Sequence, residues 1–148
     1  MIKQIEKMDI FNGLSKGELE IIAGLTETMQ VNKGDALFNE KDDAKYIYIL
    51  LKGKVRIQVQ LSSKPETVAI NVLTQTGSLI GWSGLLPGQY YTAAAVCQED
   101  SELLAIEGTK LMHALEEDPV MGFKVMRKFT EVVSSRLRNI QRNLLKTF

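Results

Sequence analysis

The stretch KGDALFNEKDDAKYIYILLKGKVRI, residues 33–57, decides the fold of this chain. Its apolar runs are short, and turn residues separate them at Gly34-Asp35 and at Lys52-Gly53. Short apolar runs bounded by turn residues are typical of β-strands. We therefore predict strands over residues 36–39, 45–51 and 54–61.

The last of these segments has the clearest pattern. Apolar side chains alternate with polar ones along residues 54–61, which predicts a strand with one face in the core. Downstream, similar runs predict strands over residues 67–73, 89–97 and 101–106, with a hairpin loop at 62–66. Many short strands without intervening helices favour an antiparallel sandwich or a double-stranded β-helix (jelly-roll) barrel. The fold class is therefore mainly β with flanking helices.

Helices are expected at both ends of this β-roll. Ser15 and Glu18 form a capping box that predicts a helix over residues 15–25. Thr109 is the expected cap of a helix over 110–117, and Asp118 caps a longer helix with Pro119 at its first position. The predicted single domain, 1–148, thus has N-terminal helices in 1–30, a β-roll in 31–107 and C-terminal helices in 108–148.

The last helix carries an apolar stripe. No proline interrupts it from residue 120 to residue 146, so it is about 40 Å long. A roll of about 100 residues cannot cover that length, and we expect a homodimer through this helix. The residues predicted for the dimer seam are Met126, Phe129, Val133, Leu137, Ile140 and Leu144.

Composition limits the function classes. The 148 residues are 45% hydrophobic and 24% charged, which is typical of one globular domain. No apolar run is long enough for a membrane span, no signal peptide is evident, and a single cysteine, Cys97, excludes an internal disulfide. We expect a cytoplasmic protein. Seven basic residues against Glu131 alone in 119–148 could mark a nucleic-acid contact, but a solvated helix with cations near its C-terminal end is the preferred interpretation.

The segment GSLIGWSGLLPGQYYTAAAV, residues 77–96, is the candidate binding site. It lies in a stretch from Thr67 to Gln98 that contains no Asp, Glu, Lys or Arg. The segment has the spacing of a phosphate-binding cassette but lacks the charges that such a cassette uses. The sequence therefore predicts the architecture of a sensor domain more plainly than it predicts a ligand.

Together these segments resemble the cyclic nucleotide-binding domain family. MDIFNGLSKGELEIIAGL (8–25) is similar to its opening helices, residues 33–57 to its first strands, and GSLIGWSGLL (77–86) to the start of its phosphate cassette. DPVMGFKVMRKFTEVVSSRLRNI (118–140) resembles its C-terminal dimer helix. The resemblance implies a regulatory sensor that binds a small molecule near the cassette.

Two positions depart from the family's pattern. A Glu that contacts the ribose is replaced by Trp82, and an Arg that grips the phosphate is replaced by Tyr91. Losing both contacts costs on the order of 3–6 kcal/mol, or roughly a hundred- to ten-thousand-fold in affinity. We therefore predict that the pocket does not bind cyclic AMP in the usual way. The predicted pocket residues are Leu79, Ile80, Gly81, Trp82, Tyr91, Thr92, Ala93 and Arg136.

Several alternatives remain open at this point. The aromatic residues could fill the former pocket, leaving a ligand-free dimerisation or protein-interaction module, or they could line a pocket for a less polar ligand. Substitute contacts could also hold a cyclic nucleotide. Arg136 matches a position that touches the base in the family, although a surface position beside Arg138 is the plainer interpretation.

Other chemistry has little support. His113 is the single histidine, so neither a histidine-rich metal centre nor a Ser–His–Asp triad can be assembled, and the cassette lacks the lysine of a P-loop. We expect no enzyme activity, no metal and no known cofactor. No helix-turn-helix follows the long helix, so sequence-specific DNA binding is not expected. A partner protein is the expected reader of the signal.

Overall fold

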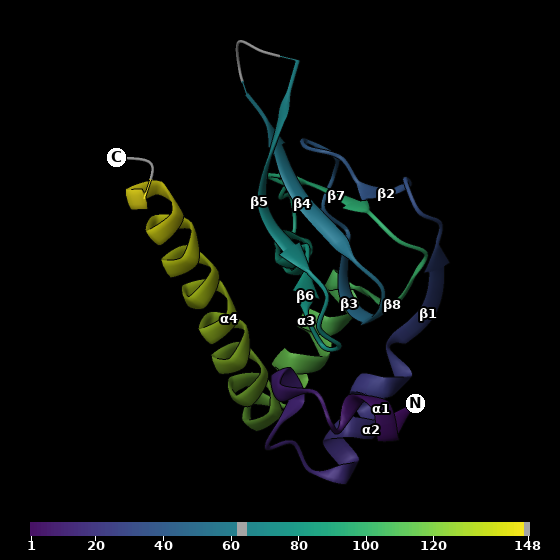
Figure 1. Cartoon of the computed structure of the whole chain (residues 1–148). Coiled ribbons are helices and arrows are strands. Elements are labelled where there is room, and N and C mark those ends of the chain that lie inside the picture. Colours follow the sequence, from purple (N-terminus) through teal and green to yellow (C-terminus); the bar gives the residue numbers. More distant parts are fainter. Residues whose placement is uncertain (62–64, 147–148) are drawn as a thin grey trace.

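The computed structural model describes residues 1–61 and 65–146. Eight strands in these residues form two four-stranded antiparallel sheets that make up one roll (Figure 1). The strands are β1 (Thr26–Val31), β2 (Ala36–Phe38), β3 (Tyr46–Lys52), β4 (Val55–Gln60), β5 (Thr67–Leu73), β6 (Leu79–Ile80), β7 (Ala94–Cys97) and β8 (Ser101–Glu107). One sheet has the order β1-β8-β3-β6 and the other β2-β7-β4-β5. The predicted jelly-roll class is confirmed.

Strands β3 and β8 are buried on both faces, which explains their continuous apolar sequences. On one face, Ile47 and Leu104 join the core that lies between the sheet and the helices. On the other face, Leu50 and Leu103 join a second core inside the roll. The chain is therefore layered, with helices on one side of this sheet and the second sheet on its other side.

Helices flank the roll as predicted, although some boundaries differ. They are α1 (Ile2–Ile5), α2 (Lys16–Gly24), α3 (Gly108–Glu117) and α4 (Pro119–Lys146). Ser15 and Glu18 form the predicted capping box on α2. The Asp118 carboxylate accepts the Met121 N–H at 3.2 Å, and Pro119 is the first residue of α4, as predicted. Among the described residues, none of the helices combines the length and apolar character that a bilayer crossing requires.

Three predicted boundaries are wrong. The range 1–30 is not all helical, because β1 pairs along its whole length with β8 and its largely exposed side chains give little apolar signal. The strand predicted over 89–97 is shorter and consists of β7 alone. Residues 89 and 91 instead form backbone hydrogen bonds with the loop at 41–44. Helix α3 begins at Gly108 without a side-chain cap, and Thr109 lies inside it. In the predicted hairpin loop, residues 62–64 lie outside the described residues.

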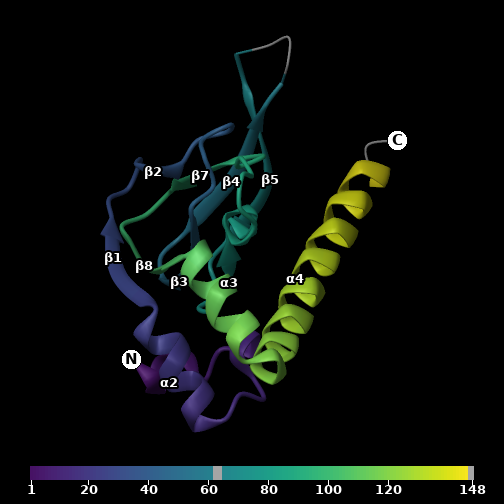
Figure 2. The same cartoon turned by 180° about the vertical axis from the view of Figure 1, so that it is seen from behind.

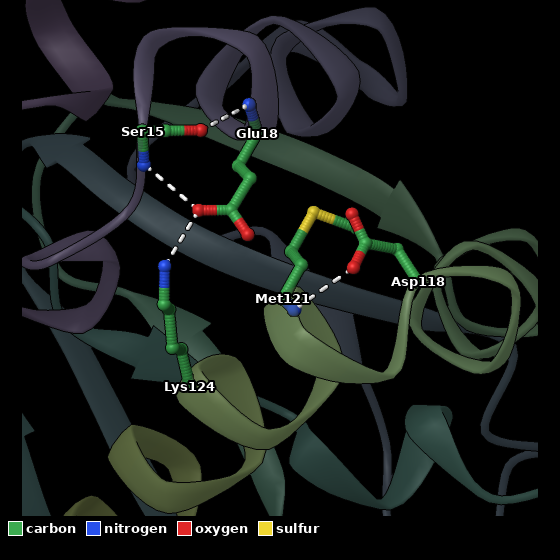
Figure 3. Close-up of polar contacts among 5 residues, drawn as sticks. All are labelled: Ser15, Glu18, Asp118, Met121 and Lys124. Atoms are coloured by element: carbon green, nitrogen blue, oxygen red, sulfur yellow. Dashed lines mark hydrogen bonds and ion pairs between the residues drawn. The ribbon is translucent and has the colours of Figure 1, made fainter.

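An ion pair ties α4 to α2. The Glu18 Oε1 atom accepts the Ser15 N–H at 2.8 Å and a proton of Lys124 Nζ at 2.9 Å (Figure 3). Glu18 is 9% exposed but the Lys124 side chain is 37% exposed, so this contact is only partly shielded from solvent. Nearby, Lys128 Nζ lies 3.5 Å from an Asp9 carboxylate oxygen. The N-terminal segment therefore holds the first half of α4 in place.

Acid is expected to weaken this junction. The Ser15 N–H, followed by Lys124, lowers the pKa of Glu18 below its ordinary value of 4.5. The ionised form therefore stabilises the fold above pH 4.5, and this contribution is lost as the pH falls through the lower native pKa. We expect Glu18→Gln to be less stable than wild type at neutral pH and to lose less stability on acidification. Urea unfolding of wild type and variant, from neutral pH to below pH 4.5, measures this difference in stability.

The matched control is Glu20→Gln, since Glu20 is an exposed carboxylate on the same helix. It should follow the wild-type acid dependence. An unchanged acid dependence in Glu18→Gln would remove Glu18 as the cause.

Helix α4 has two different halves. Its buried residues, Met121, Gly122, Val125 and Phe129, all lie in the first half. Beyond Phe129 no described residue of the helix is fully buried, and Figures 1 and 2 show this half diverging from the roll. Phe129 was predicted for the dimer seam. That prediction is wrong, because the Phe129 ring packs in the core of its own chain and is 4% exposed.

The exposed stripe of α4 has a strict spacing once Phe129 is removed from it. Its residues alternate by three and four, which is the spacing of a coiled-coil seam. Five of them were predicted, and the structure adds Phe123, which is 66% exposed, and Thr130. The stripe consists of Phe123, Met126, Thr130, Val133, Leu137, Ile140 and Leu144.

Candidate functional site

A tight glycine turn starts the candidate site. Strand β6 ends at Ile80, and Gly81 has a φ of +75° before a short 3₁₀ helix at Trp82–Leu85. A Cβ atom at Gly81 would lie 3.0 Å from ring atoms of both Phe38 and Tyr91. Glycine is needed here both for its conformation and for this close approach. The turn thus brings the cassette backbone against a pair of aromatic rings.

Tyr91, predicted to replace the phosphate-binding Arg, is held in the roll by a ring contact and by hydrogen bonds. Its ring stacks on Phe38 with centroids 3.7 Å apart and planes 13° apart. Its hydroxyl donates to the Tyr46 carbonyl at 2.5 Å and accepts the Tyr46 N–H at 3.2 Å. Burial raises the pKa of Tyr91. Because β3 already uses this hydroxyl as donor and acceptor, Tyr91 presents its ring rather than a polar group to a ligand.

Tyr91→Phe is therefore expected to destabilise the fold by about 1–3 kcal/mol, since it leaves the backbone groups of Tyr46 without their partner. Urea unfolding would measure the loss. Tyr90→Phe is the matched control, because Tyr90 is 59% exposed, and it should change stability by less than about 0.5 kcal/mol. Equal effects of the two variants would contradict a structural role for the Tyr91 hydroxyl.

A cavity of about 180 Å³ lies between the cassette, the roll and α4. Six predicted pocket residues line it: Gly81, Trp82, Tyr91, Thr92, Ala93 and Arg136. Leu79 and Ile80 do not, because their side chains are buried in the two cores. Six further residues that the sequence analysis did not assign to the pocket complete the lining: Phe38, Ile57, Ile70, Asn71, Ser83 and Ile140.

Arg136 reaches this cavity from α4. Its guanidinium carbon lies 4.9 Å from the centroid of the Trp82 ring, which is a cation–π contact. Burial lowers the pKa of Arg136 to about 10, because desolvation disfavours the charged form. The plainer interpretation, a surface arginine, is therefore wrong for Arg136 and describes Arg138, which is exposed and bonds Ser134 at 2.9 Å.

The lining contains one charge, on Arg136, and is otherwise apolar, aromatic or neutral. Within the described residues, no three His, Cys, Asp or Glu side chains are grouped closely enough to hold a metal ion. His113 is exposed, with its Nε2 atom 3.6 Å from Glu117 Oε1. The site is thus a small, mostly apolar cavity with one cation, and two of its lining residues, Arg136 and Ile140, belong to α4.

Some lining residues could have been found from the sequence. Alternation along β4 places Ile57 on the same face as Val55, which is inside the roll. Phe38 is the one phenylalanine of the first quoted segment. In contrast, no local pattern marks Asn71 or Ile70, because their place depends on how β5 pairs with β4.

Known proteins share sequence features with this chain. The pattern of the cyclic nucleotide-binding domain matches residues 28–118. The cyclic AMP receptor protein of Thermus thermophilus is 31% identical over 98 residues, which cover 66% of this chain and 44% of that protein. The chain spans less than half the length of the curated relatives it matches.

Solved structures share the fold. A cyclic nucleotide-binding domain from Methylobacillus flagellatus superposes with a TM-score of 0.85 at 18% identity, covering 99% of this chain and 82% of the other. The catabolite activator protein of Thermus thermophilus gives a TM-score of 0.76 at 24% identity, covering 93% and 62%. The likeness extends through the roll and the flanking helices.

Proposed function

Because this chain belongs to the cyclic nucleotide-binding domain family, we propose that it is the sensor part of a regulatory protein, with a pocket that no longer grips cyclic nucleotides. The observation that carries this proposal is the state of Tyr91. At the position where the resemblance expects the phosphate-binding Arg, the side chain is neutral, stacked on Phe38 and bonded to the backbone of β3. The proposed role is binding and signalling rather than catalysis.

The size of the cavity supports this proposal. Sites for drug-sized ligands and cofactors usually measure about 300–1,000 Å³. The cavity here is about 180 Å³, and Trp82 occupies part of the cassette face where the resemblance expects a small acidic side chain and a ribose. A purine, a ribose and a phosphate together need more room than this, so a cyclic nucleotide would require the cavity to widen.

The electrostatics point the same way. Arg136 is the one cation in the lining, and its guanidinium lies over Trp82. Burying a phosphate requires a partner for its charge, and the cassette itself supplies none. Substitute binding would have to move Arg136 away from the tryptophan and toward the cassette.

We further propose that two copies associate through α4. The stripe from Phe123 to Leu144 is exposed in the single chain and has coiled-coil spacing. Burying a leucine side chain such as Leu137, which is 55% exposed, contributes about 1.5–3 kcal/mol for full burial, so a few such layers stabilise a dimer. A second copy matches because identical stripes are self-complementary across a two-fold axis.

The pocket and the stripe meet on the same helix. Ile140 lines the cavity and belongs to the stripe, and Arg136 precedes Leu137 by one residue. A ligand that contacts Arg136 or Ile140 would therefore favour one position of the second half of α4 over another. A partner protein would read the resulting change in the helix pair.

Calorimetric titration with cyclic AMP and cyclic GMP tests the proposal. We expect dissociation constants weaker than about 1 mM for both, corresponding to less than about 4 kcal/mol of binding free energy. A micromolar or tighter constant for either nucleotide would overturn the proposed loss of binding. Analytical ultracentrifugation in parallel tests the dimer, since a monomer throughout the accessible concentration range would remove the helix interface.

A ligand-free dimerisation module is the second candidate. The small volume of the cavity and the Arg136–Trp82 contact favour it, because both restrict access. A thermal-shift screen separates the two candidates. A compound that raises the melting temperature in proportion to its occupancy supports a sensor, whereas no shift with any compound class supports the module.

A further inference from the structure

We propose that the cavity binds a small aromatic monocarboxylate, a single six-membered ring with a short acidic arm, and that Arg136 pairs with its carboxylate. The inference rests on the proposed function in one respect, namely that this cavity is the sensor site. It assigns the chemical class of the ligand, which neither the family resemblance nor the comparisons supply.

The volume sets the size of the ligand. An engineered apolar cavity of about 150 Å³ in another protein accommodates benzene. The cavity here, about 180 Å³, therefore accommodates one ring and a few further atoms, but not a fused ring system with a sugar.

The lining sets the character of the ring. Phe38 and Tyr91 stack to form one aromatic wall, Trp82 forms another, and Ile57, Ile70 and Ile140 contribute aliphatic surface. Flat aromatic faces of this kind favour an aromatic guest through offset-stacked or edge-to-face contacts. The Tyr91 hydroxyl is hydrogen-bonded to the Tyr46 backbone, so it offers no free donor or acceptor to a ligand at this wall.

The single charge sets the sign of the ligand. Arg136 lines the cavity, and its guanidinium lies over the Trp82 ring. No Asp or Glu is part of the lining. The five N–H donors of a guanidinium match the two oxygens of a carboxylate, and the face of the group can stay on the tryptophan while its edge binds.

Two further observations fit this assignment. The pKa of Arg136 is lowered to about 10 by burial, so the group is still charged at neutral pH and its desolvation is uncompensated by an anion. The Asn71 side-chain oxygen accepts the Val72 N–H at 2.9 Å, which leaves the amide nitrogen of Asn71 as a second donor in the lining. A bound carboxylate supplies acceptors for both groups.

Trp82 makes the test direct, because it is the single tryptophan of the chain and lines the cavity. Its fluorescence is followed while phenylacetate is added to the full chain. Phenylacetamide, which has the same shape without the charge, and acetate, which has the charge without the ring, are the matched ligands. Calorimetry repeats each titration independently of the fluorescence.

We expect saturable binding of phenylacetate, and binding of phenylacetamide and acetate at least about tenfold weaker, as the loss of a charge-assisted pair or of the ring contacts implies. Arg136→Gln should weaken phenylacetate binding by about ten- to a hundredfold. Arg138→Gln is the control, since Arg138 lies outside this cavity, and it should bind phenylacetate as the wild type does.

Other outcomes overturn the inference. They are no saturable phenylacetate signal up to about 10 mM, equal binding of the amide, or undiminished binding by Arg136→Gln. Circular dichroism of both arginine variants establishes that they are folded. Failure of the inference differs from failure of the proposed function, because the latter shows as tight cyclic nucleotide binding whatever phenylacetate does.

Discussion

Leu137→Glu is expected to convert the dimer that we propose into monomers. Leu137 is 55% exposed in the single chain and lies near the centre of the exposed half of the α4 stripe. Glutamate there would lose the burial of the exposed part of a leucine, about 1–1.5 kcal/mol, on each helix, and would bring two buried like charges together across the two-fold axis. The dissociation constant should rise by at least about a thousandfold. Sedimentation velocity across a concentration series measures this dissociation constant.

Leu145→Glu is the matched control. Leu145 is more exposed than Leu137, at 73%, and belongs to the same helix, but its position falls outside the three-and-four spacing of the stripe. It should leave the association constant within a fewfold of wild type. If both variants dissociate equally, hydrophobic exposure rather than the coiled-coil seam drives association, and the proposed register is wrong.

Phe129→Ala is expected to have the largest effect on the stability of the single chain. Phe129 is 4% exposed and packs in the core between the sheet and the helices. Truncating a buried phenylalanine to alanine typically costs about 3–5 kcal/mol, because the cavity only partly collapses. Urea unfolding in a Leu137→Glu background measures this cost without a contribution from association.

Phe123→Ala provides the comparison on the same helix. Phe123 is 66% exposed, so in the same background its loss should cost less than about 1 kcal/mol. In the wild-type background it should instead weaken the dimer, since Phe123 lies on the stripe. A large loss for Phe123 and a small loss for Phe129 would mean that the two faces of α4 are assigned the wrong way round.

Much of the fold could be predicted from the residues. The alternation along β4, the turn glycines beside β3 and the capping residues Ser15 and Asp118 are local signals, and each operates within a few neighbours. Boundaries failed where the signal was not local. Strand β1 is defined by its pairing with β8, and residues 89–93 by bonds to a loop more than forty residues earlier.

The candidate site shows the same division. The sequence by itself determined that the cassette has no charge, because Trp82 and Tyr91 replace the acidic and basic residues that the resemblance leads one to expect. It also placed Gly81 in the candidate pocket, whereas the turn at Gly81 was seen only in the structure. Only the tertiary structure showed that the Tyr91 hydroxyl is bonded to β3 and that the cavity measures about 180 Å³.

The last helix makes the physical reason plain. Its sequence determined that α4 is long and carries apolar residues on more than one face, so Phe129 and Leu137 look alike in the sequence. Which face meets the roll depends on how Lys124 and the first half of the helix dock on the N-terminal segment, a contact with Glu18 more than a hundred residues away. That docking turns Phe129 inward, leaves Leu137 exposed and directs Arg136 over Trp82.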